Sequence, residues 1–434
     1  MSFVVVALHR LAARRFSVIH RVPPKSPDSG VENRCCRERL PISKQRLFVV
    51  APLTALAALL HLVGSTHEAI AQEVSLANYI RTDSDHTTVI APRLRVDYPI
   101  VEGTTVDAVY AADIWTSASI DIRTSASKIP VTEQRDEFDL SLAQVVGDGA
   151  VSASYRNSSE PDYQSHGGSL GFSYDLASRS STVALGLSAS RDNVGRADWA
   201  QWKRDLVNIG GRVSFTQVID VDTLAMIMYE PQYVSGFQAS AYRRVAIGGN
   251  LANCWGPPEP PRVDGKPVID PSTAGVVRAP LCTEEANPEQ RLRHAFAVRG
   301  RRALGDHMSA GLAYRLYLDD WGIVSHTVQA DLVYLFVTGT HVALGYRFYM
   351  QGSADHYKPI YYQPERFMTS DKELSALSSH RASLEFEHVF SGNNLDPGLR
   401  LNLSIAPSIY FYDEFPLLAQ IRAVDFNGAL TWAY

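Results

Sequence analysis

The stretch YRLYLDDWGIVSHTVQADLVYLFVTGTHVALGYRFYMQ, residues 314–351, decides the fold. In 342–350 every even-numbered residue is apolar: Val342, Leu344, Tyr346, Phe348 and Met350. The odd-numbered residues between them are mixed and include Gly345 and Arg347. Successive side chains of a β-strand point to opposite faces, so this alternation predicts strands with one apolar face and one polar face. The runs 308–318 and 324–336 follow the same rule.

The alternating pattern recurs along the whole chain after residue 72, where helical periodicity is nearly absent. We predict about sixteen strands, near 74–83, 87–99, 104–116, 135–146, 149–158, 163–175, 181–192, 204–217, 222–234, 290–303, 307–318, 323–337, 341–352, 380–391, 398–412 and 418–434.

The connections between these strands alternate in length. After odd-numbered strands come mostly long loops, at 117–134, 193–203, 235–289 and 353–379, although 84–86 and 319–322 are short. After even-numbered strands come tight turns such as VVGDGA and VTGTH, rich in the residues that turns require. Short turns at one end and long loops at the other are typical of a transmembrane antiparallel β-barrel.

A soluble β-sandwich would show a similar alternation, with its apolar faces turned inward. Strand length favours the barrel, because many runs reach ten residues, as a tilted membrane strand requires. The C-terminal sequence VDFNGALTWAY also favours it. Its alternating Phe426, Leu430, Trp432 and Tyr434 resemble the assembly signal of bacterial outer-membrane barrels. We therefore expect even-numbered residues of 308–350 to face lipid, with Tyr314, Tyr334, Tyr346 and Phe348 in aromatic girdles.

Residues 1–71 have the features of an export signal. Lys44 and Arg46 precede the apolar run 47–63, and the small residues Ala69-Ile70-Ala71 follow it. This order predicts a signal peptide cleaved after Ala71, and a barrel domain at 72–434. A membrane anchor is the alternative, but it normally needs about 20 apolar residues. Residues 1–40 suit a signal poorly, so we expect either a start codon placed too early or an unusually long basic region.

Charge and cysteine content narrow the class of partner. Residues 72–434 contain 31 Lys/Arg and 42 Asp/Glu, an acidic balance that argues against nucleic acid. Their two cysteines, Cys254 and Cys282, lie within the loop 235–289. A disulfide is expected in an exported protein. Free thiols and a metal pair are the alternatives, but no further metal ligand is nearby, and we expect neither metal nor cofactor.

The central stretch also resembles a known family. YRLYLDDWGIVSHT followed by YRFYMQGSADHY resembles the paired motif of the bacterial outer-membrane family catalogued as domain of unknown function 3570. Upstream segments, such as EPDYQSHGGSLGFSYDL, resemble it more weakly. The motif residues are Asp319, Asp320, Trp321, Gly322, His326 and Gln351. The resemblance implies an outer-membrane barrel and no established activity.

Many residues on the predicted inner face are charged. They comprise Arg293, Arg299, Arg301, Arg315, Asp331, Arg347, Glu385 and Glu387, with Arg291, Arg93, Arg95, Asp107, Asp113 and Asp425 on other strands. A charged lumen biases the passage of ions and polar solutes. A barrel of sixteen strands is usually too wide to fill with side chains. The alternative to a water-filled lumen is a closed one, in which these charges pair with one another or residues 235–289 form a plug.

Two patterns invite an enzymatic interpretation, and we favour neither. Asp319 and Asp320 with His326 could activate water at the barrel rim, but an Asp-containing turn explains the acidic pair. Ser325 and His326 are adjacent on one strand, so their side chains point to opposite faces and cannot form a catalytic pair. The aromatic segment 353–379 could bind a glycan or protein, or pack over the barrel mouth.

The sequence thus predicts a porin-like conduit for small polar or charged solutes in the bacterial outer membrane. A non-conducting barrel that serves as scaffold or sheath for a periplasmic or surface partner is the alternative, and a rim hydrolase is a third. We expect contacts with outer-membrane lipid, lipopolysaccharide and the barrel-assembly machinery. A monomer and a trimer both fit the sequence.

Overall fold

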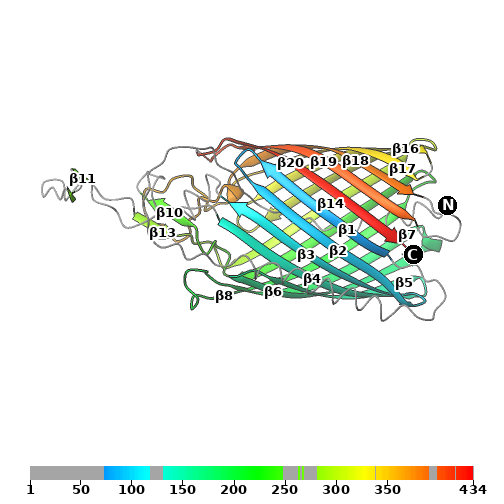
Figure 1. Ribbon diagram of the computed structural model, residues 1–434, viewed down its shortest axis with the longest axis horizontal. Helices are drawn as coiled ribbons and strands as arrows, with labels where there is room; N and C mark the ends of the chain where they lie inside the picture. Colours follow the sequence, from blue (N-terminus) through cyan, green and yellow to red (C-terminus); the bar gives the residue numbers. More distant parts are fainter. Residues whose placement is uncertain are drawn as a thin grey trace, which may run out of the picture.

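The computed structural model describes residues 73–117, 131–247, 262–263, 266–267, 281–337, 339–390, 398–415 and 417–433. Sixteen strands form one closed barrel (Figure 1). They are β1 (Glu73–Asp83), β2 (Thr88–Val101), β3 (Thr104–Ser117), β4 (Val131–Val146), β5 (Gly149–Ser159), β6 (Tyr163–Leu176), β7 (Ser181–Val194), β8 (Arg204–Val218), β9 (Thr223–Gly236), β14 (Gln290–Ala303), β15 (Met308–Asp319), β16 (Val324–Val337), β17 (Thr340–Gln351), β18 (Leu377–Phe390), β19 (Leu399–Tyr412) and β20 (Gln420–Ala433).

Antiparallel pairing of the first and last strands closes the barrel. β1 pairs with β20 from Glu73 opposite Ala433 to Asp83 opposite Ala423. Each remaining strand pairs with its neighbours in the chain, and β9 pairs with β14 across the longest loop. Closure leaves no sheet edge, so the backbone polar groups of every strand find partners within the sheet. The predicted fold class is confirmed.

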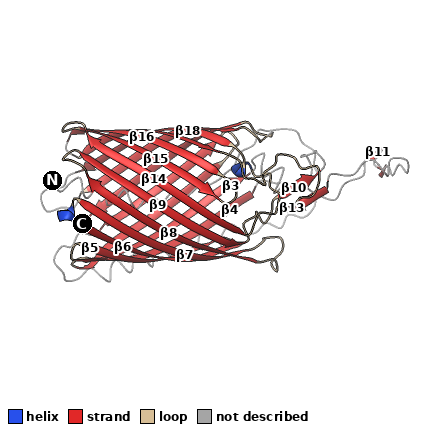
Figure 2. Ribbon diagram, turned by 180° about the vertical axis from the view of Figure 1, so that it is seen from behind, coloured by secondary structure: helices blue, strands red, loops and turns tan. Residues whose placement is uncertain are grey.

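The two ends of the barrel differ, as the connection lengths predict. At one end, here called the turn end, β1 begins, β20 ends and the short turns lie. At the other, the loop end, lie the connection from β9 to β14 with its small strands β10 (Arg244–Ile247) and β13 (Leu281–Glu284), and the connection 352–376 with the short 3-10 helix η3 (Lys372–Leu374). Figures 1 and 2 both show β10 and β13 beyond the ends of the barrel strands.

The outer surface of the barrel is an apolar belt. Leu312 and Leu344 are 63% and 56% exposed, and Leu170 and Leu187 are exposed to a similar degree. In 308–350 the exposed apolar residues on the strands mostly have even numbers, as the alternation predicts. Their odd-numbered neighbours on the opposite face include the ion-paired residues Arg315 and Asp331. The central stretch is therefore a wall with one apolar and one charged face.

Four tyrosine–histidine pairs recur on the outward face, close to the loop end. The tyrosine hydroxyl is 2.6–2.8 Å from the Nδ1 atom of a histidine on the next strand of the barrel. The pairs are Tyr155–His166, Tyr229–His294, Tyr314–His326 and Tyr346–His380. Near the turn end, Tyr334 packs against Phe336 with ring centroids 4.8 Å apart. Aromatic residues thus flank the apolar belt at both ends, as membrane girdles do.

Some predictions lie outside the described residues. The signal peptide and its cleavage after Ala71 fall in the first 72 residues, so they stay predictions. Tyr434 and Cys254 also lie outside the described part, whereas Cys282 lies on β13, which pairs with β10. The disulfide accordingly stays a prediction. Among the described residues, no helix is both long and apolar enough to cross a bilayer.

Candidate functional site in the barrel lumen

The predicted lumen residues lie on the inward face of the barrel. Arg293, Arg299 and Arg301 come from β14, Arg315 from β15, Asp331 from β16, Arg347 from β17, and Glu385 and Glu387 from β18. All eight have odd residue numbers, whereas the exposed apolar residues of the same strands, such as Phe296, Leu312 and Leu384, mostly have even numbers. The two sets therefore lie on opposite faces of the barrel wall. The structure thus brings these residues, far apart in the sequence, to one interior surface.

A glycine allows charges on non-adjacent strands to meet. Arg301 on β14 forms an ion pair with Asp331 on β16, although β15 lies between these strands. Gly311 on β15 stands in register with both residues. A Cβ atom at Gly311 would come within 2.5 Å of the Asp331 Oδ1 atom and 2.8 Å of an Arg301 nitrogen. Only glycine leaves room for this pair in its present position.

A second set of charges surrounds Asp425 on β20. Its carboxylate accepts hydrogen bonds from the Tyr79 hydroxyl at 3.0 Å and from Arg81 at 3.1 Å, both on β1. It also forms an ion pair with Arg381 on β18, which reaches past β19. Arg347 on β17 stands directly opposite Arg381 in the strand register. The sequence interpretation missed Tyr79, Arg81 and Arg381, although their odd-numbered positions on these strands would have placed them inside.

Acidic side chains dominate the facing wall. The inward residues of β3, β4 and β5 include five carboxylates and two guanidinium groups: Asp107, Asp113, Glu133, Glu137, Asp139, Arg135 and Arg156. Arg156 lies 2.7 Å from Asp139 and 3.6 Å from Glu137. In the ring of sixteen strands, β3, β4 and β5 lie opposite β15, β16 and β17. An acidic arc on β3–β5 therefore faces a wall that carries Arg315 and Arg347.

Lumen side chains lie beside solvent-accessible space. The Arg95 side chain on β2 is 46% exposed, although it is bonded to Asp107 at 2.5 Å and Asp97 at 2.9 Å. The Arg315 side chain on the far wall is 45% exposed and lies 3.7 Å from Glu230. Side chains packed into a dry core would be buried on both walls. The described lumen wall is therefore polar, and neither of these two side chains is fully covered by protein.

The paired acids Asp319 and Asp320 form a turn at the loop end. The Asp319 carboxylate accepts hydrogen bonds from the backbone N–H groups of Trp321 and Ile323, each at 3.0 Å. It also accepts from Arg291 at 2.9 Å and from the Tyr317 hydroxyl at 2.5 Å. Its side chain is fully buried. The turn interpretation of this acidic pair matches the observed bonds.

The remaining motif residues fix the loops around this turn. Gly322 has a φ of +86°, and a Cβ atom there would lie 2.3 Å from an Asp355 carboxylate oxygen. Trp321 donates from Nε1 to the Gln290 carbonyl at 3.0 Å, and Gln351 donates to the carbonyls of Glu373 and Ser375 at 2.9 and 2.8 Å. His326 is elsewhere, in an outward Tyr–His pair. The structure therefore does not bring Asp319 and His326 together.

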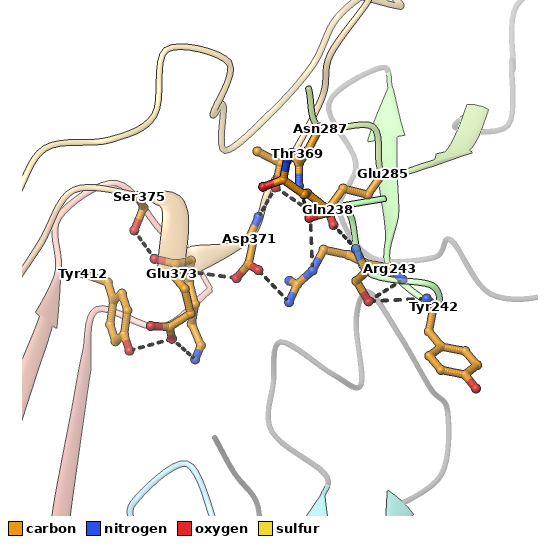
Figure 3. A network of polar contacts seen from close by, with 12 residues as sticks. Gln238, Tyr242, Arg243, Glu285, Asn287, Thr369, Asp371, Glu373, Ser375 and Tyr412 are labelled. Atoms are coloured by element: carbon orange, nitrogen blue, oxygen red, sulfur yellow. Dashed lines mark hydrogen bonds and ion pairs between the residues drawn. The ribbon is translucent and has the colours of Figure 1, made fainter. Parts of the chain in front are cut away.

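A polar network joins the two long connections at the loop end (Figure 3). Arg243 lies 3.3 Å from Asp371 and 3.7 Å from Glu285, and Glu285 also accepts from the Thr369 hydroxyl. The Tyr412 hydroxyl on β19 donates to Glu373 at 3.2 Å. The described part of 235–289 is thereby held at the barrel mouth, beyond the strand ends. The described β10 and β13 segments do not plug the lumen.

A histidine adds a further link between these loops. The ring of His356 packs edge-on against Trp321 with centroids 5.0 Å apart, and its Nε2 atom lies 3.0 Å from the Asn287 side-chain oxygen. Burial lowers the pKa of the His356 imidazole, and the positive charge of Arg291 lowers it further. The neutral ring can donate from Nε2 to Asn287, which ties the connection after β17 to the connection before β14.

Comparison with solved structures returns other barrels. "CymD monoaromatic hydrocarbon channel" is 11% identical, with 85% of this chain and 89% of that chain covered and a TM-score of 0.39. OmpT of Vibrio cholerae is 10% identical, with 85% and 99% covered and a TM-score of 0.40. OccK1 of Pseudomonas aeruginosa is 8% identical, with 84% and 98% covered and a TM-score of 0.39.

No significant match was found among curated proteins. A family model matches residues 115–205 and 195–403, which is more than half of the chain and includes the turn at Asp319 and the residues Gly322 and Gln351. The resemblance carried by the central stretch is thus confirmed, and the chain belongs to the family described as "Protein of unknown function (DUF3570)".

Proposed function

We propose that this protein lies in the bacterial outer membrane and conducts small polar or charged solutes through its lumen. The membrane location rests on the outward face. Side chains such as Leu187 and Leu312 are more than 60% exposed and belong to a belt that surrounds the barrel. Contiguous apolar surface of this extent is unfavourable in water and suits the hydrocarbon core of a bilayer.

The proposed conduction rests on one observation. Arg95 and Arg315, on different walls of the lumen, have side chains that remain about half exposed inside a closed barrel. A space that hydrates both groups accommodates polar solutes. The acidic arc on β3–β5 and the arginines opposite it orient charged solutes across this space, because interior charges act strongly in a narrow passage with low-dielectric walls. No reaction is proposed.

The conduit is tested by planar-bilayer recording of the purified, folded protein. Steady single-channel current steps in potassium chloride are expected, because hydrated charges line the passage. A preparation unfolded by heat in detergent before addition serves as the control and should give no steps. A correctly folded barrel that stays silent over many insertions would overturn the conduit and favour the alternative, a scaffold or sheath for a periplasmic or surface partner.

A further inference from the structure

We propose that the outward face of β6 and β7, near the loop end, binds the phosphate group of an outer-leaflet lipid, with Arg191 and His166 donating hydrogen bonds to it. The site rests on the proposed membrane location, because an outward site meets lipid only in a bilayer. It lies on the outside of the barrel rather than in the lumen, so it does not require conduction.

Three polar side chains form one row across adjacent strands. Asn157 on β5 stands opposite His166 on β6, and His166 stands opposite Arg191 on β7. They share the outward face with exposed residues such as Leu170 and Leu187, and each lies two or three residues from the loop end of its strand. Side chains directly opposite each other on antiparallel strands have Cβ atoms about 5 Å apart. His166 and Arg191 can therefore contact one ligand together.

Hydrogen bonds fix the position of the proton on the His166 ring. Its Nδ1 atom lies 2.8 Å from the Tyr155 hydroxyl and 3.3 Å from the side-chain nitrogen of Asn157. That nitrogen also donates to the Ser165 carbonyl at 3.4 Å. An amide NH2 group only donates, so Nδ1 is an acceptor and the neutral ring carries its hydrogen on Nε2. Among the described residues, no protein group accepts from this Nε2–H, which is thus a donor for a ligand.

Arg191 adds a positive charge and further donors. Its side chain is 74% exposed and lies 3.3 Å from Asp205 on β8, whose side chain is 61% exposed. Exposed ion pairs contribute little to stability, and one such contact leaves most of the five N–H donors of the guanidinium group available. β8 lies on the far side of β7 from β6. A ligand over β6 and β7 therefore reaches Arg191 from the side opposite Asp205.

The level of this row along the barrel favours a lipid headgroup as the ligand. A charged side chain on the outward face is costly at the bilayer midplane and is tolerated near the membrane surface. The connection from β7 to β8 carries Trp199, which is 55% exposed, and indole rings favour the interface. Phosphate oxygens match the paired N–H donors of a guanidinium group. The row thus offers a charged and a neutral donor to a phosphate at headgroup depth.

The other three outward Tyr–His pairs provide an internal comparison. Opposite their histidines on the following strand stand Leu318, Met350 and Ile409. Of the four described pairs, that of His166 is the one with an arginine in this position. Phosphate binding is therefore expected at His166 and not at the other pairs, which can serve as aromatic girdle residues without a phosphate ligand.

The test measures binding of dioctanoyl phosphatidic acid to the full chain, folded in non-ionic detergent, by native mass spectrometry. The comparison probes are dioctanoylglycerol, which has the same acyl chains and no phosphate, and inorganic phosphate, which has no acyl chains. Phosphatidic acid should bind more tightly than either. Arg191→Gln should weaken this binding by about tenfold or more, because it removes charge-assisted bonds. His166→Ala should weaken it by about threefold or more, because it removes one neutral donor.

The matched control is His326→Ala, which removes the histidine of a Tyr–His pair that has Met350 opposite. Its affinity for phosphatidic acid should equal that of the wild type. If Arg191→Gln does not fold, His166→Ala decides the matter. Wild-type affinity in the Arg191 and His166 variants, or an equal loss in His326→Ala, would overturn the site. Inorganic phosphate bound as tightly as the lipid would overturn the assignment to lipid.

Failure of the site and failure of the proposed function give different results. A barrel that binds phosphatidic acid through Arg191 and His166 but passes no current would overturn conduction and leave the site standing. A barrel that conducts, but whose variants all bind phosphatidic acid equally, would overturn the site alone.

Discussion

Asp319→Ala is expected to lower the free energy of unfolding by about 3–5 kcal/mol, the range for removing one partner of a buried ion pair. Asp319 is fully buried, and its carboxylate bonds Arg291, the Tyr317 hydroxyl and two backbone N–H groups. The substitution leaves Arg291 without this counter-charge, and it removes the carboxylate that accepts hydrogen bonds from the backbone N–H groups of the turn. Urea titration of the refolded barrel in detergent measures the loss.

The adjacent Asp320→Ala is the matched control. Asp320 is exposed, and the bond it forms at the turn is from its backbone N–H to the Leu292 carbonyl. Its substitution should change stability by no more than about 0.5 kcal/mol. Limited proteolysis of 352–376 should follow the same order, since the turn supports that connection. Equal effects of the two substitutions would contradict the turn role assigned to Asp319.

Asp425→Ala is expected to lower the free energy of unfolding by a similar amount, about 3–5 kcal/mol. The Asp425 side chain is 1% exposed and holds Arg81 and Arg381 from two other strands. Without it, two partly buried guanidinium groups lose their shared counter-charge next to Arg347. The loss should be smaller when Arg381→Met is already present, because one of the stranded charges is then gone.

Asp331→Ala offers a comparison on the same wall. Asp331 pairs with Arg301, but its side chain is 24% exposed, so water can partly replace the lost bond. A loss nearer to 1 kcal/mol is expected there. Urea titration of Asp425→Ala, of Asp425→Ala in the Arg381→Met background, and of Asp331→Ala gives the order of the losses in unfolding free energy. A loss at Asp425 no larger than that at Asp331, or no coupling with Arg381→Met, would contradict the view that Asp425 organises the charges of Arg81 and Arg381 around it.

The strands could be read from the sequence wherever one face is apolar. The predicted limits 290–303 match β14 at both ends, because apolar Phe296 and Val298 lie on one face there and Arg293, Arg299 and Arg301 lie on the other. β4 begins at Val131, four residues earlier than predicted. In that segment both faces are polar: Arg135 faces Asp113 inside, while Gln134 and Asp136 are bonded to each other on the other face. Alternation carries no signal where polar residues occupy both faces.

The lumen residues were predictable, but their pairing was not. Parity alone places Arg301 and Asp331 inside. Which charges meet depends on strand tilt and on the closure that brings Arg81 beside Asp425 from the far end of the chain. The fold of the long connections was equally hidden, because Arg243, Glu285 and Asp371 meet only once β9, β14 and β17 are placed in the barrel. Register between distant segments is a global property that local patterns do not contain.

The central claim is that the apolar face of these strands meets lipid and the charged face meets water. Spin labels attached at Leu312→Cys and Leu344→Cys, and at their neighbours Ala313→Cys and Ala343→Cys, test it directly in bilayers, in a chain whose four native cysteines are replaced by serine. We predict that labels at 312 and 344 are accessible to oxygen dissolved in lipid and shielded from a water-soluble nickel complex. Labels at 313 and 343 should show the reverse. Accessibility to nickel at 312 and 344 equal to that at 313 and 343 would contradict the membrane assignment and the conduit together.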